Sequence, residues 1–132
     1  MKEALIDTNI FVRHFLGDIP QQAQKAKEVF NSVEKKEKTG LVSILVINEL
    51  IWILEKYYNL KRKVFLPKIL KLLVFENLKI LEAKKDILIE VLEKMQKQKF
   101  DFTDLYLNQV ANGREIVSFD KDFEKIKKGR YY

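Results

Sequence analysis

Short apolar runs alternate with longer amphipathic stretches along this chain. The short runs have the length and aliphatic content of buried strands, and they predict strands at Lys2–Ile6, Gly40–Val42, Leu78–Leu81 and Glu115–Phe119. Between them, apolar residues recur every three or four positions, which predicts helices at Ile10–Leu16, Pro20–Lys38, Ile44–Tyr58, Lys61–Glu76, Asp86–Gln98 and Thr103–Ala111. Strands that alternate with helices are typical of a parallel sheet with helices on both faces, so the predicted class is α/β.

Local signals set the expected ends of these helices. Gly17 and Gly113 stop two of them, Pro20 opens one, and Ser43 caps the helix that follows the second strand. Pro67 is expected to kink or restart the helix that contains it. The chain has 132 residues and contains no repeat, linker or low-complexity segment, so a single domain over 1–132 is predicted.

Composition narrows the chemistry. The absence of cysteine excludes disulfides and thiolate zinc sites, and a single histidine cannot build a multi-histidine site. Any bound metal would therefore have oxygen ligands, which favours Mg²⁺ or Mn²⁺. The net charge of +6 suits an anionic partner such as nucleic acid. No apolar run reaches membrane-spanning length, and a cytoplasmic protein is expected.

Four acidic residues interrupt or end apolar sequence where folding alone gives little reason for them. They are Asp7, Glu49, Asp104 and Asp120. Asp7 and Asp120 each follow a predicted strand, and ligands of parallel sheets bind at the carboxyl ends of strands. Because burying an unpaired carboxylate is costly, four such acids indicate a shared cation. The sequence therefore predicts an acid-lined metal site.

Each acid also has a purely structural interpretation. Asp7 could start a turn, Asp104 could favour the start of its helix, and Asp120 with Asp122 could cap the next helix. Glu49 has no basic neighbour on its helical face, although a distant lysine could pair with it. The metal interpretation depends on the four acids acting together.

The four acidic motifs resemble, in order and spacing, those of PIN-domain proteins, and they are similar to the VapC-type toxins of toxin–antitoxin pairs. The matching segments are Asp7-Thr8-Asn9-Ile10, Asn48-Glu49-Leu50, Asp101-Phe102-Thr103-Asp104 and Ser118-Phe119-Asp120-Lys121-Asp122-Phe123. The resemblance implies a three-layer α/β/α PIN-like fold and a Mg²⁺- or Mn²⁺-dependent ribonuclease that acts on RNA, commonly as a homodimer, with a cognate antitoxin. One departure is Leu105, where the family usually has a small residue.

Carried over residue by residue, the resemblance makes four acids both catalytic and metal-binding: Asp7, Glu49, Asp104 and Asp120. It gives supporting or auxiliary roles to Thr8, Asn9, Asp101, Ser118 and Asp122. We expect Asp7 and Asp120 to anchor a first ion with Asp104, and Glu49 to hold a second ion or orient the attacking water. The implied products carry 5′-phosphate and 3′-hydroxyl ends.

Three alternatives bear on this function. A phosphotransferase of the haloacid dehalogenase type is excluded because Asn9 stands where its second aspartate is needed. A catalytically silent PIN-like RNA-binding or scaffold protein, and a DNA-directed nuclease of similar fold, both stay open. The apolar content of Ile44–Tyr58 and Val64–Phe75 exceeds the needs of one small core, which supports a homodimer.

Overall fold

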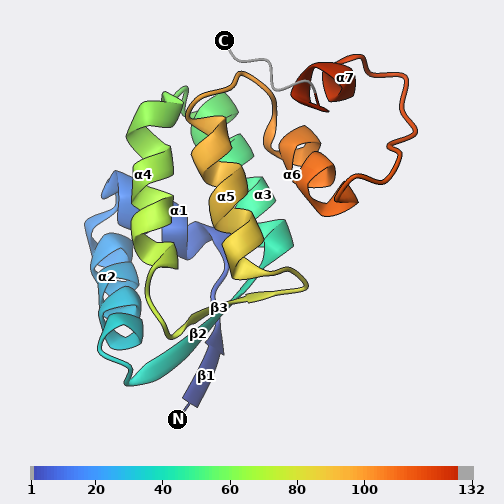
Figure 1. Ribbon diagram of the computed structural model, residues 1–132. Helices are drawn as coiled ribbons and strands as arrows, with labels where there is room; N and C mark the ends of the chain where they lie inside the picture. The colour runs from blue at the N-terminus through green and yellow to red at the C-terminus, as the bar shows by residue number, and fades with distance from the viewer. Residues whose placement is uncertain (1, 128–132) are drawn as a thin grey trace. The chain divides into compact units, whose positions relative to one another are not determined.

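The computed structural model describes residues 2–127, and the chain divides into two compact units, Met1–Lys85 and Asp86–Tyr132 (Figure 1). The first unit contains the sheet and the helices between its strands. The second contains the remaining helices and the segment that carries the last two acidic motifs.

The sheet of the first unit has three parallel strands in the order β1-β2-β3. They are β1 (Lys2–Leu5), β2 (Lys38–Ser43) and β3 (Leu78–Leu81). Lys2 pairs with Lys38, and Gly40 pairs with Leu78. Parallel pairing requires a crossover between consecutive strands, and helical segments make both crossovers in this sheet. The predicted α/β class with a short parallel sheet is confirmed.

Four helices and one π-helical segment belong to the first unit: α1 (Thr8–Leu16), α2 (Pro20–Glu34), α3 (Ile44–Trp52), η1 (Ile53–Tyr57) and α4 (Arg62–Leu73). Gly17 ends α1 in the left-handed conformation, as its position predicted. Ser43 caps α3 through its hydroxyl, which accepts a hydrogen bond from the Leu45 N–H. Pro67 lies inside α4, which continues through it as one helix, so a restart at Pro67 is not observed.

A close approach fixes how α2 lies on the sheet. A Cβ atom at Gly40 would lie 2.8 Å from the Ile6 side chain and 3.1 Å from that of Val33 in α2. Both of these neighbours are buried. Glycine therefore lets α2 and Ile6 pack directly on β2. The Ile6 N–H also donates to the carbonyl of Leu41, which extends the pairing of β1 to the residue before Asp7.

The second unit is helical: α5 (Lys85–Met95), α6 (Phe102–Ala111) and α7 (Asp122–Lys127). The side chain of Gln109 joins α6 to α5, since it accepts from Lys94 at 2.6 Å and donates to Glu90 at 2.9 Å. Helices α6 and α7 pack against each other (Figure 1). Asn112 ends α6 in the left-handed conformation, one residue before the predicted stop at Gly113.

The predicted strand at Glu115–Phe119 is wrong, because the structure has no regular element between α6 and α7. Local hydrogen bonds give the physical reason. The Asp120 N–H donates to the Ser118 hydroxyl, and the Asp122 N–H donates to a carboxylate oxygen of Asp120. Such side-chain bonds fold the backbone into turns that compete with a strand ladder.

Several helix boundaries also differ from prediction, since α1 begins at Thr8 instead of Ile10 and α4 ends at Leu73 instead of Glu76. Helix α2 ends at Glu34 instead of Lys38, since Lys36 adopts a positive φ of 62° and Lys38 already begins β2. Helix α5 ends at Met95 instead of Gln98. Helix α6 begins after Asp101, so Thr103 lies inside it and is not its cap.

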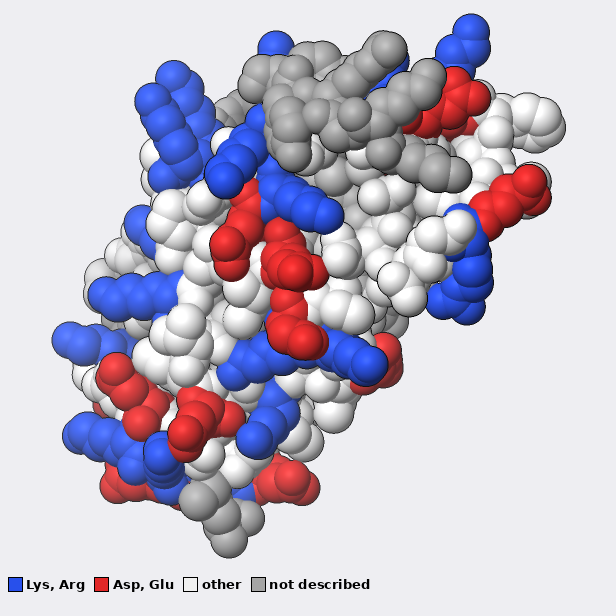
Figure 2. Space-filling view, in the orientation of Figure 1, with Lys and Arg blue, Asp and Glu red and all other residues white. Residues whose placement is uncertain are grey.

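Charge is mixed over the face drawn in Figure 2, where acidic side chains follow α5 among lysine and arginine side chains. The exposed acids of that helix are Asp86, Glu90 and Glu93. The net positive charge is therefore not gathered on this face. An anion is expected to bind at a local group of basic side chains instead. Within residues 2–127, no helix is both long and apolar enough to span a membrane.

Candidate metal centre

Three carboxylates gather in the second unit. Asp104 lies in the first turn of α6, while Asp120 and Asp122 lie just before and at the start of α7. One oxygen from each lies within 4.8 Å of the others. Asp104 and Asp122 are half-buried, and Asp120 is exposed. This set is called the aspartate triad.

Electrostatics within the aspartate triad oppose ionisation of Asp104. Burial raises the pKa of the Asp104 carboxyl, and the negative charges of Asp120, Asp101 and Asp122 raise it further. A divalent cation would reverse these effects, because it favours the charged form of every carboxylate near it. The carboxylates of the aspartate triad therefore repel one another in the protein alone, and a bound cation would offset that repulsion.

Backbone turns set the positions of Asp120 and Asp122. The Ser118 hydroxyl accepts from the Asp120 N–H at 2.9 Å, and Asp120 Oδ1 accepts from the Asp122 N–H at 2.9 Å. The structural interpretation of Asp120 as a helix cap is therefore realised. That hydrogen bond uses one carboxylate oxygen, so capping and metal binding are compatible. Ser118, predicted as an auxiliary site residue, therefore contacts the backbone of Asp120.

The first unit holds the other two acids of the predicted quartet, and Thr8 contacts both. The Thr8 N–H donates to Asp7 Oδ1 at 2.8 Å, which makes Asp7 the cap of α1. The Thr8 hydroxyl donates to Glu49 Oε1 at 2.5 Å. Thr8 itself is buried, with 2% of its surface exposed, whereas both acids are exposed. One rigid residue thus keeps two carboxylates close together, and these two are called the Asp7–Glu49 pair.

Glu49 reaches Thr8 because α3 packs against α1. Among the residues that the structure describes, no ion pair involves Glu49, which agrees with the absence of a basic neighbour in the sequence. The carboxylate is held by a hydroxyl and not by a cation. Among the described residues, no basic side chain therefore neutralises the Glu49 carboxylate.

The carboxyl edge of the sheet carries a further acid that the sequence analysis did not select. Glu82 directly follows β3 and has a positive φ of 64°. Its carboxylate accepts from the Ser43 hydroxyl at 3.0 Å and from the Ile44 N–H at 3.0 Å. Glu82 thus caps α3, the helix that carries Glu49. Its place directly after an apolar strand, like that of Asp7, was the signal that could have found it.

The remaining predicted site residues have these positions. Asn9 is exposed in the first turn of α1, and Asp101 is the exposed residue that precedes α6. Leu105 is buried with 1% of its surface exposed, so the departure from the usual small residue fills the core of the second unit. The structure groups Asp104, Asp120 and Asp122 in one unit, and Asp7 and Glu49 in the other.

Comparison with known families matches residues 4–129 of the chain to the PIN domain. The chain therefore belongs to the PIN domain family, and the predicted three-layer α/β/α class fits that family. PIN domains are generally nucleases and generally depend on divalent metal ions. No curated protein and no solved structure matches the chain. Family membership thus supports a nuclease and nothing narrower.

Proposed function

We propose that this protein is a Mg²⁺- or Mn²⁺-dependent endoribonuclease and the toxin of a VapBC-type toxin–antitoxin pair. The observation that carries the proposal is the aspartate triad, with three carboxylate oxygens within 4.8 Å. A structural role alone does not explain why the half-buried Asp104 faces two other acids. The silent scaffold is disfavoured for the same reason.

The residues of the aspartate triad fit a hard divalent cation. All of their donor atoms are oxygens, and Mg²⁺ in proteins commonly binds a few carboxylates and keeps several waters. When bound, the ion would neutralise the phosphate charge and lower the pKa of a bound water. Asp104, Asp120 and Asp122 would hold it.

The Asp7–Glu49 pair would act on the same phosphodiester. We assign Asp7 to the metal shell, and Glu49, fixed by Thr8, to orienting the attacking water and accepting its proton. Attack on phosphorus with departure of the 3′ oxygen, which takes up a proton, gives 5′-phosphate and 3′-hydroxyl ends. Asn9 and Asp101 would assist from the rim of the site. This assignment makes residues 1–132 one nuclease domain that acts in the cytoplasm.

The direct test is incubation with structured RNA, and with DNA of the same sequence, in Mg²⁺, Mn²⁺ or EDTA. We expect RNA cleavage that requires the metal, leaves 5′-phosphate ends and is lost in Asp104→Asn. Equal cleavage of both polymers would make the protein a general nuclease, and cleavage of DNA alone would contradict the RNA assignment. Cleavage that persists in EDTA would contradict the metal requirement.

The toxin role has its own test. Expression of the wild-type protein should arrest growth of the host cell, and Asp104→Asn expressed at the same level should not. Growth arrest by both proteins would separate toxicity from the nuclease. Normal growth with active wild-type enzyme would contradict the toxin assignment while leaving the ribonuclease in place.

A homodimer is the proposed assembly, since apolar side chains are exposed along α3 and η1. Leu45, Trp52 and Tyr57 are 72%, 59% and 69% exposed. Leu45 and Trp52 are two helical turns apart and so share one face of α3. Trp52 is the only tryptophan, so its fluorescence reports on this surface directly. We expect a blue shift as concentration rises, abolished in Leu45→Glu; an unchanged spectrum with a monomeric mass would contradict the dimer.

A further inference from the structure

A concave site lies wholly within the first unit. It is a cavity of about 390 Å³ between the later parts of α1, α2 and α4. Its wall is aromatic: Phe30 is buried, and His14, Phe15 and Phe75 are half-buried. Exposed Lys68 and Lys71 stand at its rim.

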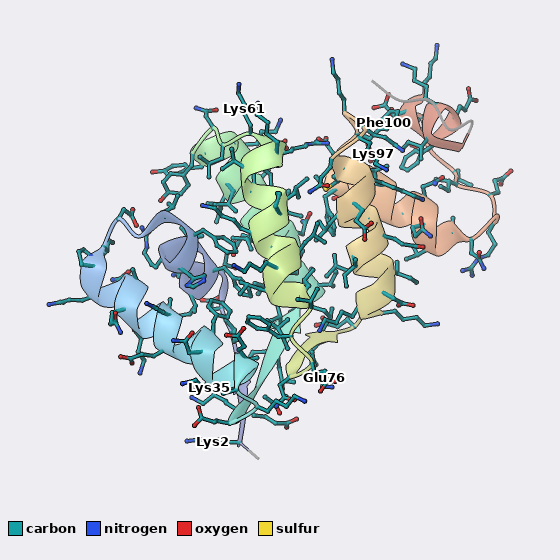
Figure 3. The ribbon with its side chains drawn as sticks, turned by 60° about the vertical axis from the view of Figure 1, so that its left-hand side comes forward. Lys2, Lys35, Lys61, Glu76, Lys97 and Phe100 are labelled. Atoms are coloured by element: carbon teal, nitrogen blue, oxygen red, sulfur yellow. The ribbon has the colours of Figure 1, made fainter. Side chains whose placement is uncertain are left out.

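The cavity is remote from the Asp7–Glu49 pair. His14 follows Asp7 by seven residues, which is about 10 Å along a helix. Figure 3 shows Lys35 and Glu76, which follow α2 and α4, at the same end of the first unit as Lys2 of β1. The later parts of α2 and α4, which line the cavity, therefore lie towards the amino edge of the sheet, whereas Asp7 follows the carboxyl end of β1.

Lys68 and Lys71 give the rim a positive charge. They are three residues apart on α4 and so lie on one face of that helix. Within residues 2–127, no ion pair involves either lysine. The nearby Glu76 is paired with Lys36 at 2.6 Å, which leaves Glu34 as the acid among the lining residues. The two ammonium groups are therefore available to an anion.

His14 belongs to the aromatic wall and not to the positive rim. Its pKa is lowered by burial and by the charges of Lys27 and Lys68, which favours the neutral ring. The ring centroid lies 4.8 Å from that of Phe30 and 5.7 Å from that of Phe15. A neutral imidazole among phenyl rings offers a flat surface to another ring.

We propose that this cavity is a subsite for one nucleotide of single-stranded nucleic acid, with the base against Phe15 and Phe75 and the phosphate at Lys68 and Lys71. Stacking on aromatic rings combined with cationic contacts to the backbone is how sequence-tolerant single-strand sites work. The volume falls in the range of roughly 300–1,000 Å³ typical of small-ligand sites, whereas a docked helix about 10 Å wide needs a long groove. A nucleotide is thus favoured over a helical segment of a protein.

This inference extends the proposed function, because the nuclease is what brings a nucleic acid to this chain. Its test uses binding without catalysis, so the two can fail separately. The full-length Asp104→Asn protein is titrated in EDTA with fluorescent single-stranded RNA and DNA of roughly twelve nucleotides, a length within the range of single-strand binding sites. Anisotropy gives the dissociation constant over a series of salt concentrations.

We expect Lys68→Gln/Lys71→Gln to weaken binding of both polymers about tenfold. The slope of log affinity against log salt should fall in magnitude by about 0.7, since the two lysines contact one phosphate and each phosphate contact to a single strand contributes about 0.7. Phe75→Leu keeps an apolar side chain but removes a ring. It should weaken binding about fivefold and leave the salt slope unchanged.

Lys25→Gln/Lys63→Gln is the matched control, because it removes two exposed lysines from α2 and α4 that do not line the cavity. Equal changes of slope in the two double variants would overturn the proposal, since general charge would then explain them. Unchanged nucleic-acid binding in Lys68→Gln/Lys71→Gln would also overturn it. If that variant instead loses binding of a peptide of alternating Glu and Phe, the cavity belongs to a protein partner.

Discussion

The two sets of acids in this protein use the same functional group in opposite environments. In the Asp7–Glu49 pair, each carboxylate accepts a hydrogen bond from Thr8. In the aspartate triad, burial and neighbouring charges raise the pKa of Asp104. The first set is positioned without a cation, while the second repels itself. We therefore expect cation affinity to reside mainly in the second unit. We expect the first unit to position the reacting water.

The largest expected effect follows from removing a charge from the aspartate triad. Asp104→Asn keeps the shape of the side chain, and we expect cleavage of RNA to fall at least about a hundredfold as metal-ligand function is lost. Steady-state cleavage with excess Mg²⁺ measures it. Glu93→Gln, an exposed acid of α5 in the same unit, is the control and should cleave like wild type.

Metal binding should be visible in stability as well. A ligand that binds only the folded state adds about 2.7 kcal/mol at a hundred times its dissociation constant, so Mn²⁺ should raise the Tm. Asp120→Asn should lose most of this rise, whereas Glu49→Gln should keep most of it. Thermal melts with and without Mn²⁺ decide this. If both variants lost the Mn²⁺-induced rise in Tm equally, the cation affinity of the aspartate triad would not differ from that of the Asp7–Glu49 pair.

A smaller effect is expected from the support of Glu49. Thr8→Val has nearly the same shape but cannot donate to Glu49, and loss of such a positioning bond typically costs about tenfold in activity. Thr8→Ser keeps the hydroxyl and should restore cleavage to near the wild-type rate. The Mn²⁺ response of the Tm should stay unchanged in both, and a lost response in Thr8→Val would place Glu49 among the principal ligands.

The smallest effect concerns pH in the absence of metal. Because the folded-state pKa of Asp104 is raised, its carboxylate destabilises the fold at neutral pH, and this penalty disappears as pH falls through that pKa. Asp104→Asn should therefore melt above wild type at neutral pH in EDTA. The difference should shrink as pH falls towards the ordinary carboxyl value of 3.8. A difference that grows on acidification would contradict burial and charge repulsion as its cause.

Sequence periodicity was enough to predict the three paired strands and the helices between them, because the helices and β2 bury apolar side chains at regular spacing. It failed at Glu115–Phe119, where an apolar run has the composition of a strand but Ser118 and Asp120 bond to their own backbone. The start of α6 directly after Asp101 and the role of Glu82 were also missed. Such contacts depend on backbone geometry between elements, which a hydrophobic pattern does not encode.

The sequence pointed to a set of acids as the candidate site, but it did not indicate how the structure groups them. The sequence assigned Asp104 and Asp120 to a first ion and Glu49 to a second ion or the attacking water, but it did not indicate how their surroundings differ. Asp122 was predicted as auxiliary, yet it lies within the aspartate triad. Burial of Thr8 and the bond that it donates to Glu49 could be found only once α1 and α3 were placed together.

We propose that the two sets of acids serve one reaction, and a double-mutant cycle tests this shared role. The kcat/KM for RNA cleavage is measured for wild type, Asp7→Asn, Asp104→Asn and the double variant. Residues that act as a unit are strongly non-additive. We therefore predict that the double variant loses about as much activity as either single variant. Losses that multiply in the double variant would contradict a shared role.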